Sequence, residues 1–205
     1  MDSAVNESRS LTRRERLRNE TRPAHMRLDA LVTAHNFFSS VERYGAWLQR
    51  SYDFHEQLEK TLGNAGAGGL FVDWDAHRKT GLIKHDLADL GLEIQNLSVQ
   101  SELALADHIE CLGALYVMEG ASMGARVLLI AAHRLGFTDQ QGARHLSTAA
   151  SSMHPWRSFV AMLEAAHCTP ADEDRMIDAA RRTFDLATAC FSDHGLQNRS
   201  TVEAK

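Results

Sequence analysis

A histidine in the first helix-like segment of the chain is well placed to bind a metal or a ligand. His25 lies one helical turn after Thr21, and arginines occupy positions 14, 18 and 22 before it. At 100° per residue the segment has one apolar stripe with His25 at its edge, formed by Leu17, Thr21, Leu28 and Val32. The imidazole is therefore expected to point into an apolar space with a basic rim. A core-edge histidine hydrogen-bonded to a neighbour would show the same spacing, so both interpretations stay open at this point.

A second segment, ALYVMEGASMGARVLLIAAHRLGF, carries glycines where a helix does not favour them. Gly120 and Gly124 are four residues apart, and each costs a helix about 1 kcal/mol relative to alanine. Two explanations account for them: close contact between two helices, or a flat ligand lying against the backbone. By the same angular count one face is nearly bare backbone, formed by Gly113, Val117, Gly120, Gly124 and Ala131, with Ala121 beside it.

The elements that must position these residues are predicted to be helices. The 205 residues include only 3 prolines and 13 glycines, and alternating strand-like runs are hard to find. Long stretches rich in Ala, Leu, Glu and Arg favour helices instead, so the fold is expected to be all-α. The first helix is predicted from about Thr12 to Val32. Pro23 inside it requires either a kink or a second helix start capped by Thr21.

The remaining helices are predicted from apolar periodicity and end signals. The last one has Thr169 as its N-cap, Pro170 at its first position and Gly195 at its far end. The others are a long helix after the cap Ser40, a shorter one over Asp75 to Leu90, a buried central one from Ser101 to about Leu135, and one around Pro155 to Ala166.

Composition and charge are those of a folded globular domain. Hydrophobic residues make up 44% of the chain and charged residues 24%, and a net charge of -5 disfavours nucleic acid as a partner. Glu110, Glu119 and Arg126 interrupt the most apolar segment and argue against a membrane span. We expect one helical domain over residues 10–194 between flexible tails at 1–9 and 195–205. Three widely spaced cysteines and the lack of a signal-like apolar run favour a reducing, cytoplasmic location.

Other chemistries have little support in the sequence. No HExxH or CxxC motif occurs, so zinc hydrolase and disulfide oxidoreductase functions have no anchor. The one GxSxG match, from Gly120 to Gly124, lies inside a predicted helix and not at a strand-to-helix turn, so a serine hydrolase function has no anchor either. Glu164 and His167 form a single Glu-x-x-His, whereas a carboxylate-bridged di-iron bundle needs two. We expect these two residues to form a surface pair.

Taken together, the two motifs suit a flat macrocycle held between a helix with one imidazole and a helix with glycines on the facing side. Their order and separation resemble the haem oxygenase family, particularly short bacterial forms associated with phytochromes. LRNETRPAHMRLD is similar to the proximal-helix pattern L-(R/K)-x-x-T-x-x-x-H of that family, and LYVMEGASMGARVL is similar to its glycine-rich distal helix. The resemblance extends more weakly from about Leu11 to His194. It implies an all-α domain that binds haem as substrate and cofactor together.

The resemblance also implies roles for individual residues. His25 would be the proximal ligand of the haem iron, and Gly120, Ala121 and Gly124 would form the catalytic distal face. Arg157 is a candidate for the basic contact that the family makes from a late helix. Further contacts with haem are expected from Arg18 and Arg22, which would bind its propionates, and from Thr21, Tyr116, Val117 and Phe184.

The activity that the resemblance implies is cleavage of haem to biliverdin, carbon monoxide and iron. It uses dioxygen and electrons from a ferredoxin or a flavin reductase, and a phytochrome would accept the biliverdin. Ala121 departs from the pattern, because several members carry an aspartate there that organises water for proton delivery. This departure keeps a non-catalytic haem carrier or sensor open as the rival function. A cofactor-free hydrolase of thiamin-like pyrimidines shares the helical architecture, but it would need a reactive cysteine that the sequence does not mark.

Overall fold

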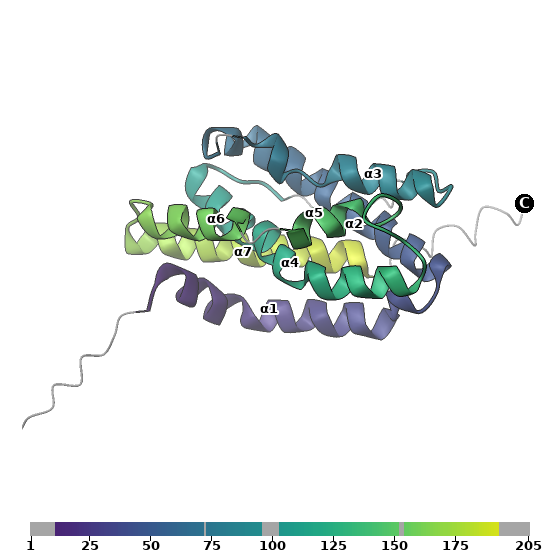
Figure 1. Cartoon of the computed structure of the whole chain (residues 1–205). Coiled ribbons are helices and arrows are strands. Elements are labelled where there is room, and N and C mark those ends of the chain that lie inside the picture. The colour runs from purple at the N-terminus through teal and green to yellow at the C-terminus, as the bar shows by residue number, and fades with distance from the viewer. Residues whose placement is uncertain (1–10, 72, 96–102, 152–153, 193–205) are drawn as a thin grey trace, which may run out of the picture.

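The computed structural model describes residues 11–71, 73–95, 103–151 and 154–192, which leaves the predicted tails outside the description. Within these ranges the protein is helical, and the prediction of an all-α fold is confirmed. Three short 3₁₀ turns lie between the helices: η1 (Phe37–Ser39), η2 (Ala67–Gly69) and η3 (Asp75–His77). The α-helices are α1 (Arg13–His35), α2 (Val41–Asn64), α3 (Thr80–Asp89), α4 (His108–Arg134), α5 (Arg144–Ser151), α6 (His154–Ala165) and α7 (Pro170–Phe191) (Figure 1).

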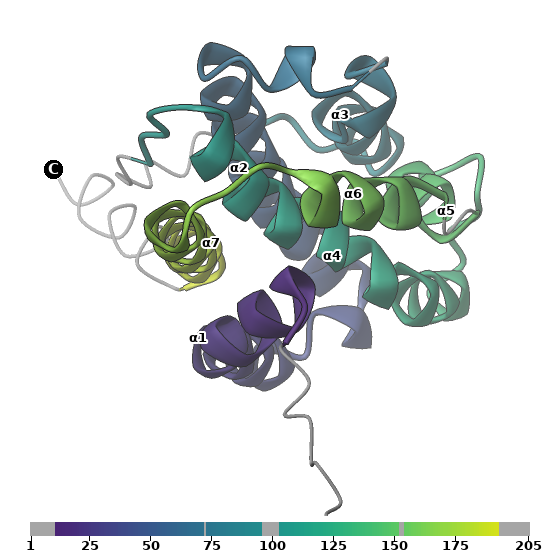
Figure 2. The ribbon, with the colours of Figure 1, turned by 90° about the vertical axis from the view of Figure 1, so that its left-hand side faces the viewer.

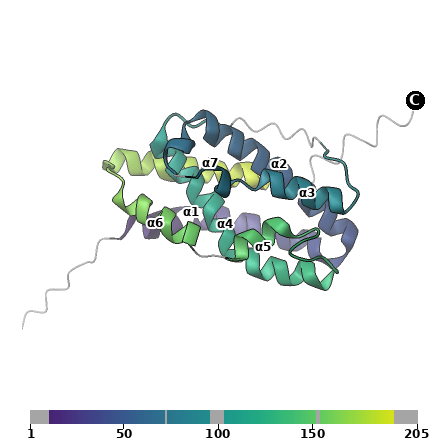
Figure 3. The same cartoon turned by 45° about the horizontal axis from the view of Figure 1, so that its top comes forward.

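Helix α4 runs through the middle of the molecule. Figure 2 shows α1 on one side of α4 and α7, with α2 and α3 on the other side. Figure 3 shows α5 and α6 following one another alongside α4. The core lies between these helices, and its largest fully buried side chains include Leu17, Tyr44, Leu48, Leu112, Leu115, Phe159 and Met176.

Helix α1 runs unbroken through Pro23. Thr12 caps its start, because the Thr12 hydroxyl accepts the Glu15 N–H at 3.2 Å and the Glu15 carboxylate accepts the Thr12 N–H at 2.9 Å. Thr21 does not cap a second helix. Its buried hydroxyl donates to the Leu17 carbonyl one turn earlier, at 2.7 Å. The alternative of a second helix start at Thr21 is therefore wrong.

The segment predicted as one helix from Asp75 to Leu90 is divided into η3 and α3. The division lies opposite Glu59 of α2, which is buried. Its carboxylate accepts the backbone N–H of Lys79 at 2.6 Å and that of Thr80 at 3.0 Å. A carboxylate on another helix thus satisfies N–H groups that the start of a helix leaves free, so α3 begins there. The helix predicted after Ser40 is confirmed, with Ser40 as the N-cap of α2.

Helix α4 is buried over its first half only. Between Ile109 and Glu119 most residues are buried, whereas between Gly120 and Ile130 only Ala125 is. Val127, in this second half, is 71% exposed. The sequence analysis predicts a buried helix from Ser101, which lies outside the described residues, to about Leu135. The helix begins later, at His108, and the prediction of burial is right for its first half and wrong for its second. Among the described helices α4 is the one long and apolar enough, by length and composition, to cross a membrane; its first half is packed against α7.

Helix α7 begins as the sequence predicts. Thr169 is its N-cap, Pro170 is its first residue, and Asp172 completes a capping box. The helix ends at Phe191 with Ser192 as C-cap, earlier than the predicted end at Gly195, which lies outside the described residues.

Helix α5 lies between Leu135 and Pro155, where the sequence analysis predicts no helix. Asp86 of α3 caps it, because its carboxylate accepts the N–H groups of Arg144 at 3.0 Å and His145 at 3.1 Å. The cap comes from a different helix, so the local sequence of α5 carries no start signal.

Candidate functional site

His25 lies on an exposed part of α1, and a carboxylate one turn later orients its ring. His25 Nδ1 and Asp29 Oδ2 are 2.8 Å apart, with side chains 58% and 65% exposed. Because a carboxylate only accepts hydrogen bonds, Nδ1 carries the proton of the neutral imidazole. The lone pair is then on Nε2, for which the described residues provide no hydrogen-bond partner. Metal-binding histidines are typically oriented in this way.

Phe184 of α7 places an apolar side chain beside His25. The two ring centroids are 5.7 Å apart, with the rings edge to face, and Phe184 is buried. Ion pairs hold the start of α1 against the start of α7, including Arg16 with Glu173 at 2.6 Å. The structure therefore brings together two residues that the sequence analysis assigns to one site, on two neighbouring helices.

Tyr116 of α4 lies close to α1 and to several polar groups. Burial raises the pKa of Tyr116, while the Thr21 hydroxyl and the positive charges of Arg18 and Arg14 act against this rise. A phenol, a hydroxyl and guanidinium groups at one place suit a carboxylate of a ligand. Arg18 is exposed and forms no ion pair with any described residue, so its charge is available to such a group.

The other residues predicted to contact haem differ in their exposure. Val117 is buried in α4. Arg22 of α1 and Arg157 of α6 are both exposed, and neither forms an ion pair within the described ranges. Their predicted contacts with propionates stay predictions.

The glycines of α4 face different surroundings. A Cβ atom on Gly113 would lie 2.0 Å from the Met176 carbonyl oxygen of α7, so this glycine permits close contact of two helices. A Cβ atom on Gly124 would meet nothing within 4 Å, and Ala121 is exposed. The single bare face of the sequence analysis is thus two surfaces with different surroundings, and only the second is open to a ligand.

Trp156 of α6 is a residue of this region that sequence reasoning missed. Its ring is 6.0 Å from that of Tyr116, and it would be 3.8 Å from a Cβ atom on Gly120. No spacing rule singles out a tryptophan in a short helix, whereas Asp29 was detectable as a carboxylate four residues after His25.

The alternatives based on other metals or on a cysteine find no support. No group of three or more metal-binding side chains occurs in the described part of the chain. Glu164 accepts the backbone N–H groups of Arg13 at 3.1 Å and Arg14 at 2.9 Å, so the expected pairing with His167 is wrong. Burial raises the pKa of the Cys111 thiol to about 11, which keeps it protonated and unreactive near neutral pH.

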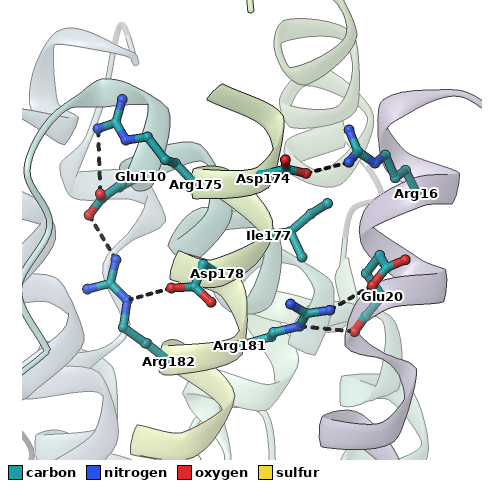
Figure 4. Close-up of a pocket in the computed structure, with 9 residues that line it drawn as sticks. All are labelled: Arg16, Glu20, Glu110, Asp174, Arg175, Ile177, Asp178, Arg181 and Arg182. Carbon is teal, nitrogen blue, oxygen red and sulfur yellow. Dashed lines mark hydrogen bonds and ion pairs between the residues drawn. The ribbon is translucent and has the colours of Figure 1, made fainter. Parts of the chain in front are cut away.

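A charged hollow of about 470 Å³ lies between α1, α4 and α7 (Figure 4). It contains none of the predicted site residues, and its charged groups pair with one another, as Arg181 does with Glu20 at 2.6 Å. Such a lining does not suit an apolar macrocycle. It is formed by Ile177, by Arg16, Arg175, Arg181 and Arg182, and by Glu20, Glu110, Asp174 and Asp178.

The residues around His25 fit haem better. An oriented imidazole, the buried Phe184, a cationic corner at Tyr116 and an open glycine surface are the features that a haem site would need as an iron ligand, an apolar wall, contacts for carboxylates and room for a flat ring. Fold and site together define a helical haem-binding protein.

Comparison with known proteins makes the assignment specific. The profile of the heme oxygenase family matches residues 11–193. Heme oxygenase PigA of Pseudomonas aeruginosa is 32% identical over 202 residues, which cover 94% of this chain and all of that protein. The solved NO- and CO-bound heme oxygenase of Neisseria meningitidis has a TM-score of 0.79 at 27% identity, covering 91% of this chain and 93% of that one. The chain belongs to the haem oxygenase family and is an enzyme that cleaves haem.

Proposed function

We propose that His25 is the proximal ligand in this haem oxygenase and that Gly120, Ala121 and Gly124 form the distal surface over the bound haem. The observation that carries the proposal is the hydrogen bond of His25 Nδ1 to Asp29, which directs the lone pair of the ring to Nε2. Bound haem supplies both the iron that activates dioxygen and the ring that is oxidised.

The protein's own groups hold the haem in place in this proposal. Phe184 packs edge to face against the His25 ring and gives it an apolar neighbour on one side. Arg18 and Tyr116 bind a propionate, and Thr21 orients the Tyr116 hydroxyl. Arg22 adds positive charge to the rim, and Val117 contributes an apolar contact from α4.

Proton delivery at the distal surface is assigned to backbone and water. Ala121 has no group that could hold a proton, and the Ser122 hydroxyl donates to the Glu119 carbonyl at 2.5 Å, within its own helix turn. Exposed backbone near Gly124 leaves space for water next to carbonyl groups.

The reaction is proposed to consume dioxygen and electrons from a ferredoxin or a flavin reductase and to release biliverdin, carbon monoxide and iron. A cytoplasmic location supplies such reductants, and a phytochrome is the proposed acceptor of biliverdin. The family assignment and the exposed cationic side chains of Arg18 and Arg22 support this scheme.

The test is turnover of hemin with a reductant in air, with His25→Ala compared with wild type. His85→Ala, an exposed histidine on α3, is the matched control. We expect the His25 variant to lose biliverdin formation and to change its ferric absorption spectrum, while the control keeps both. A wild-type spectrum and yield in His25→Ala would overturn the ligand assignment, and haem binding without turnover in the wild type would indicate a carrier.

A further inference from the structure

Glu119 is a buried carboxylate immediately before the glycine-containing stretch of α4. It is 6% exposed, whereas Ala121, two residues later, is exposed. At 100° per residue the two side chains point to nearly opposite sides of the helix. Within one turn, α4 therefore has an open surface on one side and a buried charge on the other.

The partner of Glu119 comes from outside α4. Glu119 Oε1 is 2.8 Å from His77 Nδ1, and both side chains are largely buried. The His77 ring in turn packs against Phe71, with centroids 4.0 Å apart. Since a carboxylate only accepts, His77 donates this hydrogen bond from Nδ1. A buried ionisable side chain needs such a partner, because an unpaired charge in the interior is strongly unfavourable.

The segment that carries His77 is also bonded to α2. Glu59 of α2 accepts the Thr80 hydroxyl at 2.7 Å, in addition to the N–H groups of Lys79 and Thr80. Burial opposes ionisation of Glu59, but these hydrogen bonds and the nearby His55 hold its pKa at about 2. Residues 77–80 therefore connect α2 to α4, through Glu59 at one end and Glu119 at the other.

Lys79 is close enough to the same two carboxylates for their charges to act on it. Burial lowers the pKa of Lys79, and the negative charges of Glu119 and Glu59 act against this. The ammonium group adds attraction at both ends of the 77–80 connection.

The stretch of α4 after Glu119 has few other anchors. Gly120 and Gly124 have no side chains, and between Gly120 and Ile130 only Ala125 is buried. Leu128 and Leu129, further along the helix, are partly buried against the core, so the buried side chains that flank residues 120–124 are Glu119 and Ala125. Displacing a catalytic surface by about 1 Å can cost about 100-fold in rate.

We propose that Glu119 is a positioning residue for haem cleavage, which by binding His77 fixes the glycine stretch of α4 at its distance from the haem. The inference rests on the distal surface proposed above. Glu119 does not touch haem in this assignment, since it points into the protein, and it acts through the backbone of Gly120 and Gly124.

The test compares Glu119→Gln and His77→Gln with Glu110→Gln. Glu110 lies on the same helix and is also paired, with Arg182 at 2.9 Å, but it is in the first turn of α4. Amide hydrogen exchange is measured in the haem-free protein. The C–O stretching frequency of the CO complex and the rate of biliverdin formation are measured after loading with hemin.

We expect the Glu119 and His77 variants to exchange amides 120–128 about tenfold faster than wild type, to shift the C–O stretch and to form biliverdin about tenfold more slowly. Combining the two substitutions should add little to either alone. Exchange, frequency and rate equal to those of the Glu110 control would overturn the proposal. If Glu119→Gln does not fold, His77→Gln alone decides. If the wild type forms no biliverdin, the proposed function fails, while exchange in the haem-free protein still decides on positioning.

Discussion

The two halves of α4 use glycine for opposite reasons. At Gly113 the backbone of α7 is so close that a Cβ atom would lie 2.0 Å from the Met176 carbonyl oxygen. At Gly124 such a Cβ would meet none of the described residues within 4 Å beyond the backbone of its own helix. The first glycine is required by the packing of the free protein, while the second has no packing contact with the described residues and is assigned to the distal surface in our proposal. A glycine in a helix thus indicates a close approach, and only the surroundings show what approaches.

Gly113→Ala should have the largest effect on folding. The new methyl group would overlap the backbone of α7, which cannot move as a flexible side chain can, so we expect a loss of about 3 kcal/mol in the free energy of unfolding. Urea denaturation of the haem-free protein measures it. A loss below about 0.5 kcal/mol would contradict the tight contact with α7.

Gly120→Leu should separate folding from haem binding. A Cβ atom at position 120 would be in ordinary van der Waals contact, 3.8 Å from Trp156. Leucine also favours helix, so the fold should persist. We expect haem affinity to fall by about 30-fold, from roughly 2 kcal/mol of overlap with the ligand. Circular dichroism and hemin titration check the two parts. Full affinity and activity would mean that Gly120 serves helix packing, as Gly113 does.

Ala121→Leu and Ser122→Ala test the two side chains that follow Gly120, of which the first is exposed and the second half-buried. Leucine at 121 would fill the water space of the distal surface, and we expect biliverdin formation to slow by about tenfold. The Ser122 hydroxyl bonds within the helix, so its removal should change the rate by less than about twofold. Single-turnover kinetics measure both, and the reverse order of effects would assign proton delivery to Ser122.

Gly124→Ala should give the smallest change, with the opposite sign to Gly113→Ala. The methyl group meets nothing in the free protein and removes backbone freedom from the unfolded chain. Thermal unfolding should therefore show a gain of about 0.5 to 1 kcal/mol. A clear loss of stability would contradict the open surroundings of Gly124.

The parts of the fold that local signals determine could be predicted from the sequence. Thr169 and Pro170 start α7 because cap and first turn lie within four residues of each other. The start of α5 could not be predicted, since Asp86 caps it from another helix. The separation of α3 from η3 has the same cause, because Glu59 supplies the bonds from α2.

The candidate site was predicted at the level of residue types but not of surroundings. The spacing around His25 located the imidazole, and the structure adds Asp29 and Phe184 as its neighbours. Angular counting placed Gly113 on one face with Gly124, which is correct for the helix. It could not show that α7 covers one of them, since that depends on packing between segments far apart in sequence.

The limited burial of α1 has a consequence for product release. Only Leu17, Thr21 and Ala24 of its 23 residues are buried, and ion pairs such as Arg181 with Glu20 are part of its contact with α7. Partly exposed pairs contribute up to about 1 kcal/mol each and weaken with salt. Local detachment of α1 should therefore require much less free energy than global unfolding. We expect the helix that carries His25 to be the part that yields when a long, open tetrapyrrole must leave, while α2, α4 and α7 stay folded.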